Sequence, residues 1–279
     1  MIIHLYAICW NELSILRFFF RHYEPWIDRF VLFDDGSTDG TLELLRSKRK
    51  VEVRQFLLRH PDSFVLSEKA LHDECWKESR GAADWVVVTD VDEHLYHPRL
   101  AAYLKASKRR GVTYIPALGV DIVTESLPEP GENLARTRTI GAPTPQSSKL
   151  RIFDPDAIEE VDFGVGGHDA RPSGRLALPD RDELLLLHYR HLGVNYVLPR
   201  YNSLAHRLKE QDVKNRWGWQ YRSSPEEYMR QLADLKGNLV DVVNWRYQPW
   251  RDHREPRWWR PEFDPAQVTR TGLPLGGSK

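Results

Sequence analysis

Residues 86–98, "VVVTDVDEHLYHP", carry an apolar run directly into the carboxylates of Asp90, Asp92 and Glu93. The run is too uniformly apolar for a strand with one solvated face, so it predicts a central parallel strand that is covered on both sides. Ligands of an open α/β sheet bind beyond the carboxyl ends of its strands. The stretch therefore predicts that this strand places acidic side chains at a ligand-binding edge of the sheet.

Predicted strands and helices alternate in the chain before this stretch. Apolar runs predict strands at residues 2–8, 30–33 and 51–56, and helical spacing of apolar residues predicts helices after Asn11, after Thr38 and over residues 66–79. This alternation predicts an α/β fold with a mostly parallel sheet flanked by helices and connected by right-handed crossovers. A second acidic loop, "DDGSTDGT" at 34–41, follows the predicted strand at 30–33 and lies at the same edge.

The composition excludes some classes of protein. The 279 residues are 41% hydrophobic, which is enough for a sizeable core in one domain. Lys+Arg and Asp+Glu both number 40, so the chain lacks the basic surplus that favours a nucleic-acid partner. Cys9 and Cys75 predict free thiols of a reducing compartment, hence a cytoplasmic protein. We expect no secretory signal and no membrane span, because no apolar run approaches about 20 residues.

The gathered carboxylates predict a bound cation. Like charges at one place repel one another unless something positive lies between them, and hard divalent cations prefer oxygen ligands. Asp90 and Asp92 are two residues apart and would point to opposite faces of a regular strand. Once the chain has left the sheet, they can hold different parts of one ligand.

The loop "DDGSTDGT" with the later "DVDE" resembles the GT-A fold glycosyltransferases, particularly those of family 2. The resemblance covers residues 1 to about 125 well, and "SKLRIFD", "GGHD" and "LLHYRHLG" extend it to about residue 193. It implies a Rossmann-like GT-A catalytic domain over residues 1–193, with a donor-binding half to about 125 and an acceptor and metal half over 126–193. Residues 194–279 then form a helical, Trp-rich C-terminal extension that packs on the same domain.

The resemblance also implies roles for particular residues. Those implied for nucleotide-sugar binding are Ala7, Asn11, Glu12, Asp34, Asp35, Ser37, Asp90, Val91 and Lys149. The family's D-x-D motif falls on residues 90–92, with Asp92 as the direct metal ligand and with Asp90 and His188 completing the metal shell. An imidazole ligand suits Mn²⁺ better than Mg²⁺, so Mn²⁺ is the predicted cofactor.

A sugar transfer also needs a base for the acceptor hydroxyl. In "FGVGGHDARP" the glycines permit close approach of the backbone to a ligand, and the family's catalytic Asp resembles Asp169 in position, with His168 beside it. Asp121, Glu125 and His168 remain alternatives to Asp169 as the base. Direct displacement by a base-activated hydroxyl inverts the anomeric centre, so inversion is expected.

The resemblance implies a metal-dependent glycosyltransferase that moves a sugar from a nucleotide sugar to a hydroxyl of a saccharide or glycolipid. UDP is the donor nucleotide by family analogy, and the acceptor would belong to polysaccharide biosynthesis. Two alternatives stay open. One is a metal-dependent sugar nucleotidyltransferase, although the N-terminal "ICWNELS" is not the Gly-rich basic loop typical of such enzymes. The other is a non-catalytic sugar-binding protein on the same scaffold.

The remaining segments carry weaker signals. Residues 126–148 are rich in Pro, Gly, Ser and Thr, which predicts an extended loop that can serve as a lid. Helical patterns cover residues 202–217 and 223–235. The segment 245–259, "WRYQPWRDHREPRWW", predicts either peripheral contact with the inner face of a membrane or stacking on sugars. The alternative is a tail that packs back on its own domain.

Overall fold

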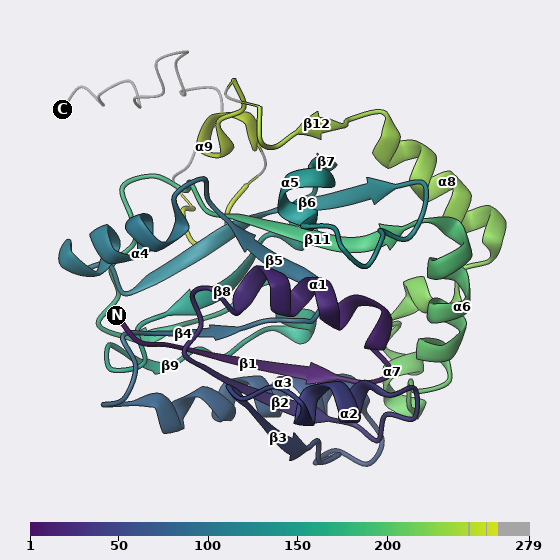
Figure 1. Ribbon diagram of the computed structural model, residues 1–279, viewed down its shortest axis with the longest axis horizontal. Coiled ribbons are helices and arrows are strands. Elements are labelled where there is room, and N and C mark those ends of the chain that lie inside the picture. Colours follow the sequence, from purple (N-terminus) through teal and green to yellow (C-terminus); the bar gives the residue numbers. More distant parts are fainter. Residues whose placement is uncertain (245, 255, 262–279) are drawn as a thin grey trace.

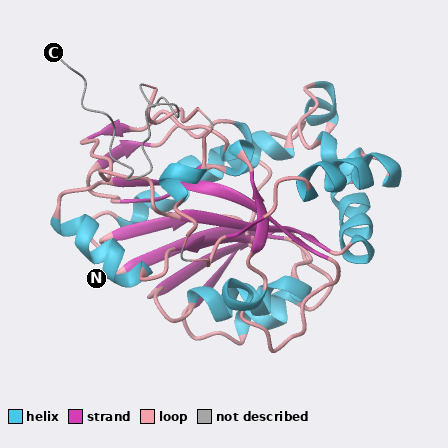
Figure 2. Cartoon of the chain, turned by 90° about the horizontal axis from the view of Figure 1, so that it is seen from above, coloured by secondary structure: helices cyan, strands magenta, loops and turns pink. Residues whose placement is uncertain are grey.

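The computed structural model describes residues 1–244, 246–254 and 256–261. Its centre is a sheet in which ten strands are described, with the order β12-β7-β6-β8-β4-β1-β2-β3 and with β11 and β5 joined beside β6. Helices lie on both sides of these strands (Figures 1 and 2). The predicted α/β architecture, a central sheet flanked by helices, is therefore confirmed.

The N-terminal half of the sheet is parallel, as the alternation of elements predicts. Its elements are β1 (Ile3–Cys9), α1 (Leu13–Tyr23), β2 (Arg29–Asp34), α2 (Thr41–Arg46), β3 (Val51–Gln55), α3 (Phe64–Glu74), the 3₁₀ turn η1 (Cys75–Ser79) and β4 (Trp85–Val88). β1 pairs in parallel with both β2 and β4, and β2 pairs in parallel with β3. All four residues of β4 are buried, and Val87 and Val88 belong to core clusters on opposite faces of the sheet. The prediction of a strand covered on both sides is correct.

The second half of the sheet is mainly antiparallel. Its elements are β5 (Glu93–Tyr96), α4 (Leu100–Arg109), β6 (Tyr114–Thr124), α5 (Leu134–Thr137), β7 (Ile140–Pro143), η2 (Pro145–Ser147), β8 (Lys149–Phe153), β9 (Ile158–Glu160), η3 (Val165–Gly167), β10 (Ser173–Gly174) and β11 (Leu185–Leu192). β8 pairs antiparallel with β4 and β6, whereas β11 pairs in parallel with β6.

Residues 126–148 are not the extended loop that their composition predicts. They contain α5, η2 and the strand β7, which pairs antiparallel with β6. Gly141 of β7 lies so close to β6 that a Cβ there would be 2.6 Å from the backbone oxygen of Asp121. The glycine that indicates a loop by composition is therefore a residue that lets two strands approach.

The described part of the C-terminal extension is mainly helical and includes one short strand. It contains α6 (Val194–Ala205), α7 (Glu210–Lys214), η4 (Trp219–Arg222), α8 (Pro225–Lys236), β12 (Val240–Asp241) and α9 (Pro249–Asp252), and β12 pairs with β7 (Figure 1). α8 begins as predicted, because Ser224 and Glu227 form a capping box. The single helix predicted over 202–217 is instead the end of α6 followed by α7.

The described part of the Trp-rich segment packs on the domain. Trp250 and Trp259 are buried, and Trp258 is half-buried. Arg257 is buried as well and lies 2.6 Å from Asp182. Trp245 lies outside the described residues. Among the residues that are described, no helix combines the length and hydrophobicity that a bilayer span requires.

Two stacked histidines, the half-buried His22 of α1 and the buried His94 of β5, make the stability of the fold dependent on pH. The rings of His22 and His94 stack with centroids 4.5 Å apart, and Nδ1 of His94 has no hydrogen-bond partner. Burial lowers the pKa of His22 to about 4, and burial followed by the proximity of His22 lowers that of His94 well below its usual value. Both rings are thus neutral in the fold near pH 6.

We expect the stability contributed by these neutral rings to be complete above about pH 6.5 and to fall as the pH drops toward about 4, because the unfolded chain takes up protons first. His94→Phe should reduce this slope by about 1.4 kcal/mol per pH unit. Chemical denaturation at several pH values measures the slope. An unchanged slope in the variant would contradict the burial of a neutral His94.

Candidate functional site

The acidic turn lies where the chain passes from one part of the sheet to another. Asp90, Val91 and Asp92 connect β4, which pairs with β1, to β5, which pairs with β11. All three residues line a cavity of about 210 Å³. The turn follows the carboxyl end of the parallel strand β4, which is the predicted ligand-binding position.

His188 of β11 lies beside Asp92 in this cavity. Its Nε2 is 3.7 Å from Asp92 Oδ1, and its Nδ1 is 3.2 Å from Asp121 Oδ1. Ser147 Oγ donates a 2.6 Å hydrogen bond to the same carboxylate. Burial alone would raise the pKa of Asp121, but the hydrogen bond from His188 and the charge of Arg190 hold it below its usual value. A carboxylate behind a histidine orients the ring and leaves its other nitrogen free for a metal.

Asp90 belongs to a network of buried charges. Arg151 of β8 donates a 2.8 Å hydrogen bond to Asp90 and lies 2.7 Å from Glu93, while Lys149 lies 2.8 Å from the other oxygen of Glu93. Burial alone would raise the pKa of the fully buried Glu93, but the charges of Arg151 and Lys149 hold it well below its usual value. The network stays ionised and fixes the acidic turn against β8.

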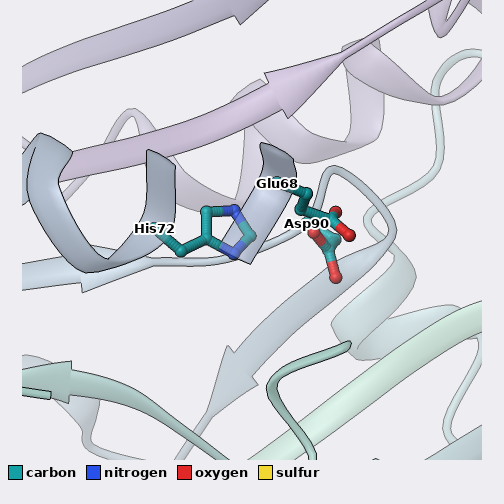
Figure 3. A group of neighbouring side chains, drawn as sticks. All are labelled: Glu68, His72 and Asp90. Carbon is teal, nitrogen blue, oxygen red and sulfur yellow. The ribbon is translucent and has the colours of Figure 1, made fainter. Parts of the chain in front are cut away.

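A second group of metal-ligating side chains lies on the other side of Asp90. Glu68 and His72, one helical turn apart on α3, lie next to Asp90, and one ligand atom from each of the three residues lies within 4.8 Å of the others (Figure 3). His72 is buried and its Nε2 has no hydrogen-bond partner. Burial and the charge of Asp90 raise the pKa of Glu68 to about 8. In the described part of the chain no other group of three meets this distance, so Asp90 is not grouped in this way with Asp92 and His188.

The loop after β1 reaches the cavity through Glu12. Its carboxylate accepts a 2.5 Å hydrogen bond from Arg200 of α6, and burial, opposed by Arg200, raises its pKa to about 7. Asn11 instead ties this loop to the next one, since its Oδ1 accepts the N–H of Thr38 at 2.7 Å and its own N–H donates to Ser37 Oγ at 2.9 Å. The two loops predicted to bind a nucleotide are therefore joined to each other.

The acidic loop after β2 does not line this cavity. Asp34 is buried, and its Oδ2 accepts the N–H groups of Gly36 and Ser37, both at 3.1 Å. This is the turn-forming alternative for an aspartate in such a loop. Asp35 forms an ion pair with Arg207, which follows α6. The C-terminal extension thus contacts the predicted nucleotide loop.

His168 and Asp169 follow η3, and only His168 lines the cavity. Its Nδ1 lies 2.5 Å from the backbone oxygen of Gln146, so Nδ1 carries the proton and Nε2 the lone pair. Although His168 is exposed at the surface, partial desolvation by its neighbours and the charge of Lys149 lower its pKa to about 4, and the ring is neutral at pH 7. Asp169 is exposed, and its carboxylate packs over Gly164, where it leaves no room for a Cβ.

The structure brings together about half of the residues expected from the sequence. Those that line the cavity are Glu12, Asp90, Val91, Asp92, Lys149, His168 and His188. Those that do not line it are Ala7, Asn11, Asp34, Asp35, Ser37 and Asp169, together with the alternative bases Asp121 and Glu125. Ala7 is buried in the core and Glu125 is exposed at the end of β6.

Four more residues line the cavity that the sequence did not predict there, namely Glu68, His72, Arg190 and Arg200. The spacing of Glu68 and His72 carried a signal, because residues four apart share one face of a helix. Arg200 carried none, since α6 reaches the site only through tertiary packing.

A second cavity of about 430 Å³ adjoins the first. Residues that border both cavities include Glu68, His168 and Tyr221. His168 therefore lies at the border between the two cavities.

Comparisons with known proteins gave similar solved structures but no family assignment. No family model matches the chain, and no curated protein matches it. Among the similar structures is S. aureus TarS, with 15% identity over 56% of this chain and 28% of TarS and a TM-score of 0.32. The glucosyl-3-phosphoglycerate synthase from Mycobacterium tuberculosis in complex with Mn²⁺, UDP and phosphoglyceric acid has 17% identity over 60% of each chain and a TM-score of 0.36.

The same synthase with phosphoglyceric acid has 18% identity over 60% of this chain and 61% of the synthase, with a TM-score of 0.37. The chain thus spans less than two thirds of the length of each of these structures.

Proposed function

We propose that the chain is a metal-dependent glycosyltransferase that moves a sugar from a nucleotide sugar to a hydroxyl of a saccharide or glycolipid, with inversion. The observation that supports this proposal is the arrangement of Asp92, His188 and His168 around one cavity, at the turn that connects β4 to β5. Asp121 lies 3.2 Å from Nδ1 of His188 and orients the ring of that residue. UDP as the donor nucleotide and an acceptor from polysaccharide biosynthesis remain parts of the proposal.

The residues of the cavity fit a divalent cation at Asp92 and His188. Metal bonds to oxygen and nitrogen are about 2.0 to 2.6 Å long, so two ligands of one ion lie roughly 3 to 4 Å apart, and Asp92 Oδ1 and His188 Nε2 are 3.7 Å apart. The group of Glu68, His72 and Asp90 is the less favourable place, because the guanidinium of Arg151 already lies beside Asp90. When bound, Mn²⁺ or Mg²⁺ neutralises charge on the departing diphosphate, and the imidazole favours Mn²⁺.

The nucleotide sugar would occupy the first cavity. Lys149 lines it and would face the diphosphate as a positive charge. The joined loops that contain Asn11 and Asp35 lie beside it and would hold the base and ribose. Ion pairs of Arg200 with Glu12 and of Arg207 with Asp35 connect the extension to these two loops.

His168 would act as the general base, with Asp169 as the alternative. Nε2 of His168 takes the proton of the acceptor hydroxyl, and the acceptor oxygen forms a bond to the anomeric carbon. The bond from that carbon to the diphosphate oxygen breaks, and the nucleoside diphosphate leaves with its electron pair. Since the hydroxyl attacks opposite the leaving group, the configuration inverts.

A panel assay separates this proposal from its alternatives. We expect the full chain with Mn²⁺ to release a nucleoside diphosphate from at least one UDP-, GDP- or dTDP-sugar, by transfer or slow hydrolysis, and to bind UDP more tightly with Mn²⁺ than with EDTA. Release of pyrophosphate from a nucleoside triphosphate and a sugar phosphate would favour a nucleotidyltransferase. Absence of nucleotide binding and of release would favour a non-catalytic protein.

A further inference from the structure

The second cavity is lined in part by residues that have no role in the proposed binding of the donor. Arg216, Trp217 and Trp219 line this cavity and do not line the first one. Arg216 and Trp217 lie between α7 and η4 of the C-terminal extension, and Trp219 begins η4. Val65 of α3 lines the same cavity. The cavity therefore combines a surface of the catalytic domain with residues of the extension.

Trp219 is exposed in a way that core packing does not explain. Its exposed fraction is 54%, whereas Trp250 and Trp259 of the same extension are 8% and 7% exposed. Trp217 is half-buried beside it. An exposed indole at the mouth of a cavity offers a flat apolar face and an N–H donor, which suits the alternating C–H and hydroxyl groups of a pyranose ring.

Arg216 adds a positive charge to this cavity. No ion pair of the described residues includes Arg216. Its φ is 58°, and it follows the last turn of α7, a position where glycine or asparagine is favoured. This backbone ends α7 in a Schellman motif, in which the N–H of Trp217 donates to the Asp212 oxygen at 2.9 Å and that of Arg216 to the Val213 oxygen at 3.1 Å. The motif involves only the backbone of Arg216, and its side chain lines the cavity. The carboxylate that lines this cavity is Glu68, at the border with the first cavity.

We propose that this cavity is the acceptor subsite and that it takes a saccharide bearing an acidic group, either a uronate carboxylate or a sugar phosphate. The sugar ring stacks on Trp219, the acidic group binds Arg216, and the reacting hydroxyl reaches His168 at the border of the two cavities. The inference rests on the glycosyl-transfer function proposed above, because it assigns the second substrate of that reaction. Guanidinium groups bind carboxylate and phosphate with two parallel hydrogen bonds, which makes both acids suitable.

Calorimetry on the full chain tests the subsite with four probes. Tetragalacturonate is compared with maltotetraose, and glucose 6-phosphate with glucose. We expect one acidic probe to bind at least about tenfold more tightly than its neutral counterpart, and the pair that shows this preference identifies the acid as uronate or phosphate. Equal or weaker binding of both acidic probes, or no binding of any probe, would overturn the proposal.

Two variants with matched controls locate the binding. Trp219→Ala should weaken the binding of both the preferred probe and its neutral counterpart by about tenfold. Arg216→Gly, which suits the positive φ, should abolish the preference for the acid and leave the neutral probe unchanged. As controls, Met229→Ala and Arg230→Ala, at exposed positions of α8, should change neither the affinity for the probes nor the preference for the acid. Variants that bind like the wild-type protein would overturn the assignment.

The same samples keep this proposal separate from the proposed function. Binding of UDP with Mn²⁺ should be unchanged in Trp219→Ala and Arg216→Gly, because these residues do not line the first cavity. If UDP binds and no acidic probe is preferred, only the acceptor subsite is wrong. If UDP does not bind the wild-type protein, the transferase function itself is wrong, whatever the saccharide results.

Discussion

Asp92→Ala is expected to abolish Mn²⁺-dependent binding of UDP and, with it, sugar transfer. The carboxylate lies 3.7 Å from His188 Nε2, and its loss removes one of the two groups proposed to hold the cation. We expect the affinity for UDP in the presence of Mn²⁺ to fall by more than about 100-fold, since even the loss of a group that only supports a metal ligand costs 10- to 100-fold. Affinity in EDTA should be unchanged. Calorimetry with and without Mn²⁺ measures both values.

The fold should survive this change. Asp92 lies in a turn, and Arg200, which is 3.7 Å from it, keeps its 2.5 Å contact with Glu12. A thermal unfolding midpoint close to that of the wild-type protein serves as the control. His72→Ala tests the competing position of the metal. If that variant loses the Mn²⁺ dependence while Asp92→Ala keeps it, the cation lies with Glu68, His72 and Asp90 instead.

The parallel half of the fold was predictable because its signals are local. Apolar runs that end in polar turns define β1, β2 and β4, and the resulting strands occur where the sequence places them. Residues 126–148 were not predictable in this way. β7 contains Gly141 and Pro143 and forms a strand because its neighbour β6 is already in place. Pairing with a distant strand outweighs local preference there.

The candidate site shows the same division between local and tertiary information. Asp90 and Asp92 follow a strand directly, so their place at its end could be predicted from the sequence. Glu12 and Asp35 were also expected near the site, but their partners, Arg200 and Arg207, come from a segment that the sequence only marks as helical. Spacing along the chain carries no information about which charge a helix brings to which loop. Spacing along the chain also does not distinguish which of the two adjacent residues, His168 or Asp169, acts as the base.

Orientation distinguishes these two adjacent residues. Both residues are exposed, but only His168 borders the two cavities, whereas the carboxylate of Asp169 packs on Gly164. A base has to lie within hydrogen-bond reach of the hydroxyl that it deprotonates. His168 meets this condition for an acceptor in the second cavity, and its hydrogen bond to Gln146 leaves Nε2 unprotonated.

His168→Asn is therefore expected to lower turnover by about two to four orders of magnitude, the usual contribution of a general base, whereas Asp169→Asn should lower it by less than about tenfold. Asparagine can still donate to the Gln146 oxygen from a position close to that of Nδ1, so the variant removes the lone pair of Nε2 and little else. Donor affinity should stay within about threefold of the wild-type value in both variants, which separates loss of the base from loss of the site. Single-turnover measurements with the donor found in the panel give the rates. The reverse order of effects would assign the base to Asp169 and would require the η3 loop to turn when the acceptor binds.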